Sequence, residues 1–240
     1  MKIVIPMAGR GSRLAGWQNN IPKPLIQIAG RPMIEWALES FKGLPAAEVI
    51  FILLAEHENQ FGIKQKLRQK FNKLSRFIML NEVTQGQLCT VLAAREWIDP
   101  DEDLLIASAD TLVVSDLAND ISSRSKDCRG LISIATLPGD NWSFARTDND
   151  GNVIAVAEKL RISDNASTGL YYFSSGQEFL EVGDEIIARQ EKTRGEYYVI
   201  PVYQKYIERG WKVGISKADE VWDMGNPDAI AKFENHLKES

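Results

Sequence analysis

The stretch MAGRGSRLAGWQNNIPKPL, residues 7–25, follows an apolar run at Lys2–Pro6 that predicts a first β-strand. A glycine-rich turn at the carboxyl end of a strand in an α/β sheet is a frequent place for anionic ligands. Glycine lets the backbone come close to a phosphate, and the exposed amides point at it. We therefore expect a phosphate-binding loop that contains Met7, Ala8, Gly9, Gly11 and Ser12.

Two cations accompany this loop. Arg13 lies within it, and Lys23 follows ten residues later between Pro22 and Pro24, whose fixed φ angles keep the lysine in a stiff, non-helical segment. Arginine can bind phosphate oxygens bidentately and lysine acts as a point charge, so the pattern is typical of a polyphosphate site. A structural tight turn with solvated surface cations is the alternative.

Two other phosphate-binding motifs do not fit the spacing of the glycines. A dinucleotide fingerprint would need glycine at Leu14, given Gly9 and Gly11, and a P-loop would need lysine at Trp17. The loop therefore belongs to another class of phosphate site.

The composition is that of an ordinary globular protein. The 240 residues include 28 Lys+Arg and 33 Asp+Glu, for a net charge of −5, with 44% hydrophobic residues. That acidic balance argues against nucleic acid as a partner, and no apolar run is long enough to span a membrane. The N-terminus lacks a signal-peptide pattern, and the two cysteines, Cys89 and Cys128, form no metal motif or disulfide framework, so we expect a cytoplasmic location.

Apolar runs alternate with helical patterns through the first half of the chain. Strands are expected at 2–6, 49–54, 77–80 and 104–107, and helices at 33–41, 58–71 and 87–97. In the second half, strands are expected at 131–135, 143–147, 153–158, 168–173 and 212–215, and helices at 179–189, 197–209 and 227–237. The turn at 148–152 predicts a hairpin. This order predicts an α/β fold with a Rossmann-like, doubly wound, mostly parallel sheet and an antiparallel excursion.

The segment PMAGRGSRLAGWQNNIPKPLIQIAGRPMIE, residues 6–35, resembles the signature of the sugar-1-phosphate nucleotidylyltransferases. That signature has a glycine loop ending in Gly-Thr-Arg-Leu, then Pro-Lys-Pro-Leu, then Gly-Lys-Pro. The chain has Gly-Ser-Arg-Leu, Lys23 at the matching distance and Gly30-Arg31-Pro32, with Ala8 in place of the first family glycine. The resemblance implies the nucleotide-diphospho-sugar transferase fold in one catalytic domain, 1–240. About 1–110 would bind the nucleotide and 111–240 the acceptor.

Other landmarks of this resemblance imply substrate-binding residues. Gln85 and Gly86 match the region that recognises the base, although a polar helix cap is the alternative. Glu158 and Lys159 match a pair that binds the sugar hydroxyls and the sugar phosphate, and a solvated ion pair at a hairpin end is the alternative. Gly169 lies in a strand that resembles the floor of the acceptor pocket, and the Gly-Glu-Tyr-Tyr at 195–198 resembles a helix start beside it.

The resemblance also implies a Mg²⁺ site. Asp110 ends the buried run LLIASAD, and Asp223 lies in VWDMGNP, which matches the second metal-binding segment of the family. Mg²⁺ prefers one or two carboxylates together with water and phosphate oxygens, which this pair could provide. The alternative for Asp110 is a cap on a following helix.

The implied activity is transfer of a nucleotide from a nucleoside triphosphate to a sugar 1-phosphate, with release of pyrophosphate. Arg13 and the loop amides would hold the triphosphate, and Lys23 would bridge the donor and acceptor phosphates. A CTP-dependent enzyme for a phosphocholine-like acceptor is an alternative. A glycosyltransferase is less favoured because no Asp-x-Asp follows the strand at 104–107, and a binding module without activity is a third reading. A homo-oligomer is left open.

Overall fold

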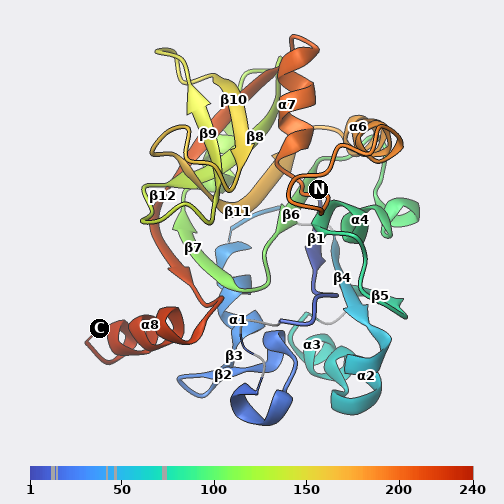
Figure 1. Cartoon of the computed structure of the whole chain (residues 1–240), viewed down its shortest axis with the longest axis vertical. Helices are drawn as coiled ribbons and strands as arrows, with labels where there is room; N and C mark the ends of the chain where they lie inside the picture. Colours follow the sequence, from blue (N-terminus) through green and yellow to red (C-terminus); the bar gives the residue numbers. More distant parts are fainter. Residues whose placement is uncertain (12–13, 15, 42, 46–47, 72–74, 240) are drawn as a thin grey trace.

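The computed structural model describes residues 1–11, 14, 16–41, 43–45, 48–71 and 75–239. Across these residues a 10-stranded sheet runs in the order β5-β4-β1-β6-β11-β8-β12-β7, with β9 and β10 beside that path (Figure 1). Its strands are β1 (Lys2–Pro6), β4 (Glu48–Leu54), β5 (Ser75–Leu80), β6 (Leu104–Ala107), β7 (Thr111–Ser115), β8 (Cys128–Ala135), β9 (Ser143–Thr147), β10 (Val153–Glu158), β11 (Ala166–Phe173) and β12 (Lys212–Asp223). Strands β2 (Gln27–Ile28) and β3 (Arg31–Pro32) form a separate ribbon.

Strand β1 lies between β4 and β6 and is parallel to both, so that Ile3 opposes Val49 on one side and Leu105 on the other. From β1 the chain continues to β4 and then to β5, which is parallel to β4. It then returns to the opposite side of β1 as β6. The direction of winding therefore reverses at β1, and ligands of open α/β sheets bind at such a point, outside the carboxyl ends of the strands.

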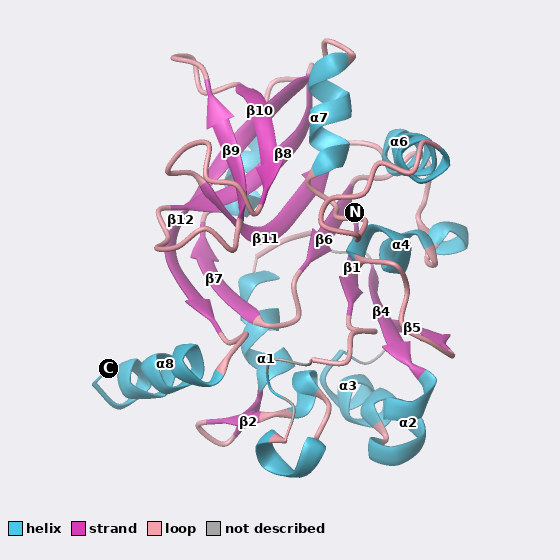
Figure 2. Ribbon diagram, viewed as in Figure 1, coloured by secondary structure: helices cyan, strands magenta, loops and turns pink. Residues whose placement is uncertain are grey.

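Helices cover both faces of the sheet (Figure 2). Neighbouring side chains of a strand point to opposite faces, so Ile3 and Ile5 join one apolar core and Val4 joins the other. The first core includes residues of α1 (Met33–Leu38), α3 (Ile63–Phe71), α5 (Leu117–Ser123) and α8 (Pro227–Glu239). The second includes residues of α4 (Gln87–Leu92), α6 (Gly176–Ala188) and α7 (Pro201–Glu208). The predicted doubly wound α/β fold is confirmed. Within the described ranges, no helix combines the length and the apolar character needed to cross a bilayer.

The second half of the chain adds the antiparallel part of the sheet. Strand β11 is antiparallel to both β6 and β8, and the β9–β10 hairpin joins β11 through a pair between Ala166 and Phe144. The Asp148 carboxylate accepts hydrogen bonds from the backbone amides of Asp150 and Asn152, at 3.0 and 2.9 Å, which closes this hairpin as predicted. The antiparallel excursion is likewise confirmed.

Several predicted boundaries are wrong for local reasons. The single helix expected at 58–71 is two helices, α2 (Ala55–Phe61) and α3, because Gly62 adopts a left-handed conformation with φ of 59°. The helix expected at 87–97 ends at Leu92, and a 3-10 turn follows at Arg95–Trp97. The helix expected from 197 begins at Pro201, a residue favoured in the first turn because it lacks an N–H.

Strand β12 extends to Asp223 although only 212–215 was expected. Its second half is polar because it pairs with β7 near an edge of the sheet instead of in the core. Strand β7 and helix α5 were not predicted.

Candidate active site

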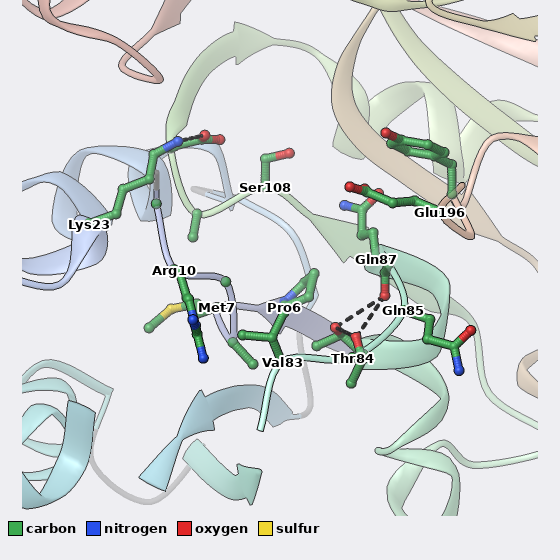
Figure 3. A pocket seen from close by; sticks show the side chains of 18 of the residues that line it. Pro6, Met7, Arg10, Lys23, Val83, Thr84, Gln85, Gln87, Ser108 and Glu196 are labelled. Atoms are coloured by element: carbon green, nitrogen blue, oxygen red, sulfur yellow. Dashed lines mark hydrogen bonds and ion pairs between the residues drawn. The ribbon is translucent and has the colours of Figure 1, made fainter. Parts of the chain in front are cut away.

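A cavity of about 840 Å³ opens where β1 and β6 end (Figure 3). Its walls come from segments that are far apart in sequence, namely residues 6–11, 23–24, 83–87 with Thr90, 108–110, and 195–196 with Tyr198. The cavity therefore lies at the point in the sheet where the fold rules place a ligand.

The predicted glycine loop forms one wall of this cavity. Met7, Ala8, Gly9 and Gly11 all line it, whereas Ser12 and Arg13 lie outside the described residues. Gly11 has a φ of 63°, and a Cβ atom there would lie 3.0 Å from Cβ of Lys23, so glycine lets the loop approach the lysine closely. We did not predict that Arg10 lines the cavity. Its place in the same glycine loop was a signal that could have identified it.

Lys23 and Asp110 form a hydrogen-bonded ion pair at the edge of the cavity. Lys23 begins a short 3-10 helix (Lys23–Leu25) directly after Pro22, so the expectation that its segment is non-helical is wrong. The two side chains are 17% and 24% exposed, which is less accessible than an ordinary surface pair. The fold thus brings together two predicted site residues that are 87 positions apart.

Asp223 lies beside Asp110 through the backbone, although it is not among the residues that line the cavity. In the antiparallel pair of β7 and β12, Asp223 opposes Thr111, and the Met224 amide donates a hydrogen bond of 2.8 Å to the Asp110 carbonyl. One carboxylate oxygen of Asp223 accepts from the Gly225 amide at 2.9 Å. Strand β7 begins at Thr111, so a strand and not a helix follows Asp110. The alternative that Asp110 caps a helix is wrong.

The chemistry of these two side chains fits Mg²⁺. Both supply hard oxygen ligands, and within the part of the chain that the structure describes no group of three His, Cys, Asp or Glu residues could hold a metal ion. Two carboxylates would leave the other positions to water and phosphate oxygens, which is the arrangement that Mg²⁺ prefers.

Gly86 lets the wall at 83–87 lie directly against the segment at 195–198. It has a φ of 133°, and a Cβ atom at this position would lie 2.4 Å from the Tyr197 carbonyl oxygen. The Tyr197 amide donates to the Gln85 carbonyl at 2.9 Å, and the Leu88 amide donates to the Tyr197 carbonyl at 3.0 Å. These bonds join the wall at 83–87 to the second half of the chain.

The side chains of this wall differ in direction. Gln85 is exposed and its amide oxygen accepts from Lys192 Nζ at 2.7 Å, so the Gln85 residue lines the cavity while its side-chain amide is held at the surface. Gln87, which we did not predict, extends toward Glu196 in Figure 3. Thr84 and Thr90 both donate to the Gly86 carbonyl, at 2.9 and 3.3 Å, and so hold the loop in shape.

Replacing Gly86 with alanine is expected to force this wall away from Tyr197, because the added Cβ meets backbone atoms that cannot rotate aside. We expect a loss of about 1–3 kcal/mol in the free energy of unfolding, the usual cost of an added methyl group in a packed region. Gly139→Ala is a matched control, since Gly139 also has a positive φ but a Cβ there meets nothing within 4 Å. Equal losses in thermal unfolding of the two variants would contradict the steric explanation.

Two of the predicted acceptor residues, Lys159 and Gly169, contact residues that line the cavity. The Lys159 ammonium lies 4.6 Å from the centre of the Tyr198 ring and donates to its hydroxyl, and Tyr198 lines the cavity. Gly169 has a φ of 87°, and a Cβ there would lie 2.2 Å from Oγ of Ser108, another lining residue that we did not predict.

The Glu158 carboxylate lies against residues of β9 and β11. The Ser143 hydroxyl donates to its carboxylate, and the Tyr171 hydroxyl donates to Ser143 at 3.2 Å. Burial raises the pKa of Glu158, whereas the Ser143 hydrogen bond and the positive charge of Lys159 lower it in part. Glu158 and Lys159 thus have separate partners. Among the contacts of the described residues there is no ion pair between the two side chains, which was the alternative.

Comparison with known proteins identifies the family. The family model described as "Nucleotidyl transferase" matches residues 2–240. The chain is 28% identical over 232 residues to the "Bifunctional protein GlmU" of Thermotoga petrophila, in an alignment that covers 93% of the chain and 48% of the relative. The chain therefore spans about half the length of the curated relatives it matches first.

Solved structures resemble the chain over nearly its whole length. A nucleoside-diphosphate-sugar pyrophosphorylase from Vibrio cholerae RC9 is 30% identical with a TM-score of 0.82, and the match covers 97% of the chain and 99% of that structure. The inositol-1-phosphate CTP transferase from T. maritima is 12% identical with a TM-score of 0.76, covering 100% and 96%. The second likeness concerns the fold alone.

Proposed function

Because the chain belongs to the nucleotidyl transferase family, we propose that it transfers a nucleotide from a nucleoside triphosphate to a sugar 1-phosphate and releases pyrophosphate. One observation carries this proposal: a cavity at the switch point of the sheet is lined by a glycine loop, Lys23 and Asp110. These are the groups that a reaction between two phosphates needs. The similarity to a nucleoside-diphosphate-sugar pyrophosphorylase supports the same reaction class.

In the proposed reaction, an oxygen of the acceptor phosphate attacks the α-phosphorus of the triphosphate in line. A new P–O bond forms as the bond between the α-phosphorus and the bridging oxygen breaks, and that oxygen leaves with pyrophosphate. The acceptor is already anionic at neutral pH, so the reaction needs no side-chain nucleophile or general base. Catalysis then depends on position and on stabilisation of charge.

The described residues have separate tasks in this scheme. The backbone of residues 7–11 would bind the triphosphate, and Lys23 would contact the donor and acceptor phosphates where they meet. Arg13 would assist the loop, as the sequence predicts. When bound, Mg²⁺ would neutralise charge on the phosphate oxygens, and Asp110 and Asp223 would hold it.

The two parts of the chain would bind different substrates. Residues 1–110 would hold the nucleotide, with Gln85 and Gly86 in the wall beside the base. Residues 111–240 would hold the acceptor through Glu158, Lys159 and Gly169. We also propose a cytoplasmic location, which is supported by Cys89 and Cys128 being free thiols. A homo-oligomer remains a prediction.

Release of pyrophosphate tests the proposed function. The full chain is incubated with each of ATP, GTP, CTP, UTP and dTTP, against sugar 1-phosphates and phosphocholine as acceptors. We expect release that requires both a triphosphate and a sugar 1-phosphate. Release with CTP and phosphocholine only would show that the acceptor is phosphocholine-like and not a sugar 1-phosphate. No release from any pair would contradict the proposed function.

Lys159→Ala is expected to raise the KM for the acceptor about tenfold or more while leaving the affinity for the triphosphate nearly unchanged. Lys159 is adjacent to Tyr198 on the acceptor side, and loss of one charged contact typically costs about 1.5–3 kcal/mol. Calorimetry of triphosphate binding and kinetics with the acceptor separate the two effects. Lys212→Ala, which removes an exposed lysine paired with Asp127 elsewhere in the molecule, serves as the control. A large loss of triphosphate affinity in Lys159→Ala would assign Lys159 to the donor instead.

A further inference from the structure

The ion pair between Lys23 and Asp110 joins two groups that the proposed reaction uses for different ligands. Lys23 is a positive charge beside the glycine loop, which suits a phosphate, and Asp110 is a carboxylate that suits a divalent cation. In the ligand-free protein the ammonium donates to the same carboxylate that a cation would need. The ammonium engages Oδ2 of Asp110, while Oδ1 accepts from the Thr111 hydroxyl at 3.4 Å. A cation on Oδ2 and a phosphate on the ammonium therefore both require the pair to open.

We propose that this ion pair couples the two binding events: Lys23 occupies Asp110 in the ligand-free protein, and phosphate binding withdraws Lys23 and makes Asp110 available to a divalent cation. The inference rests on the proposed function for the identity of the ligands. It goes further in coupling the two ligands, because each group is less available to its own ligand while the ion pair is closed.

The backbone on both sides of the pair is held in place, so opening requires movement of side chains only. Lys23 lies between two prolines and against Gly11. The Asp110 carbonyl accepts from the amide of Met224, a fully buried residue. The glycine loop that would bind the phosphates is already in contact with the lysine stem. A small rotation of the Lys23 side chain would therefore exchange the carboxylate for a phosphate.

This arrangement has a reciprocal consequence. If phosphates strengthen cation binding by releasing Asp110, removal of the competing lysine must do the same without any phosphate. Likewise, removal of Asp110 must strengthen phosphate binding by releasing Lys23. Both substitutions are therefore expected to strengthen the binding of one ligand, although each would lower the turnover number.

The first test titrates Mn²⁺ alone into the full ligand-free chain and measures binding by calorimetry or by electron paramagnetic resonance. We expect Lys23→Met to lower the Kd for Mn²⁺ about tenfold, within the usual range of coupling between sites. Lys23→Gln is a second variant in case the first does not fold. Arg10→Met is the control for net charge, because Arg10 also lines the cavity and is not the partner in this ion pair. It should change the Kd by about twofold at most, and Asp110→Asn added to Lys23→Met should remove the gain.

The second test measures binding of inorganic tripolyphosphate without metal, which avoids the need to know the base. Asp110→Asn should bind tripolyphosphate several-fold more tightly than the parent chain. Glu196→Gln, which also removes a negative charge from the cavity wall, should show a clearly smaller gain.

Several results would overturn the coupling. These are unchanged or weaker Mn²⁺ binding in both Lys23 variants, an equal gain in Arg10→Met, or a gain that persists after Asp110 is replaced. None of these measurements requires turnover. An inactive parent chain that shows both reciprocal gains would refute the proposed reaction and retain the coupling, and an active parent chain without the gains would do the reverse.

Discussion

Replacing Lys23 with alanine is expected to lower the turnover number by about a hundredfold or more. This is the scale measured when one preorganised donor of charge stabilisation is removed from an active site. Lys23 lines the cavity beside the glycine loop, in a rigid segment that fixes where its ammonium can reach. Rates of pyrophosphate release at saturating concentrations of both substrates test this expectation.

The fold should hardly change in Lys23→Ala, because Lys23 contributes a partly exposed ion pair and no core contact. Thermal unfolding of the variant provides that control. Lys64→Ala replaces a lysine on α3, outside the cavity, and should leave turnover as it is in the parent chain. Full turnover in a folded Lys23→Ala variant would contradict the assignment of Lys23 to the reacting phosphates.

The sequence predicted those features that depend on local patterns. The continuous apolar runs at Lys2–Pro6 and at the other parallel strands reflect burial between two layers of helices, so the strands could be recognised one at a time. The glycine loop could be recognised because its glycines and the Pro-Lys-Pro motif restrict the backbone locally. The position of the cavity followed from the loop coming directly after the first strand.

Features that depend on contacts between distant segments were not predictable in the same way. Asp110 has no cation near it in sequence, and only the folding of the chain brings it to Lys23. The side-chain amide of Gln85 is held by Lys192, which is 107 positions away, whereas Gln87 extends toward Glu196. Tyr198 meets Lys159 from a segment that precedes α7, which begins at Pro201, whereas its sequence resembles a helix start. These side-chain directions and contacts are determined by tertiary packing and not by the local sequence.

Asp110 and Asp223 are expected to act as one unit, and this gives the second large effect. The pairing of β7 with β12 joins their backbones, since Asp223 opposes Thr111 and the Met224 amide bonds to the Asp110 carbonyl. If both carboxylates hold a single Mg²⁺, Asp110→Asn and Asp223→Asn should each lower turnover about a hundredfold or more. The double variant should lose little more than either single variant, because residues that act together are not additive.

The concentration of Mg²⁺ needed for half-maximal rate provides the second measurement. It should rise in both single variants, and EDTA should abolish activity of the parent chain. The hydrogen bond from Met224 uses the main chain of Asp110, so replacing the side chain leaves the junction of the two strands in place. A loss of activity therefore reports on the carboxylates themselves and not on the strand pairing. Strictly additive losses in the double variant, or activity undiminished by EDTA, would contradict a shared ion. Asp110 would then have a structural role with Lys23 and Thr111, and Asp223 a structural role that includes its bond to the Gly225 amide.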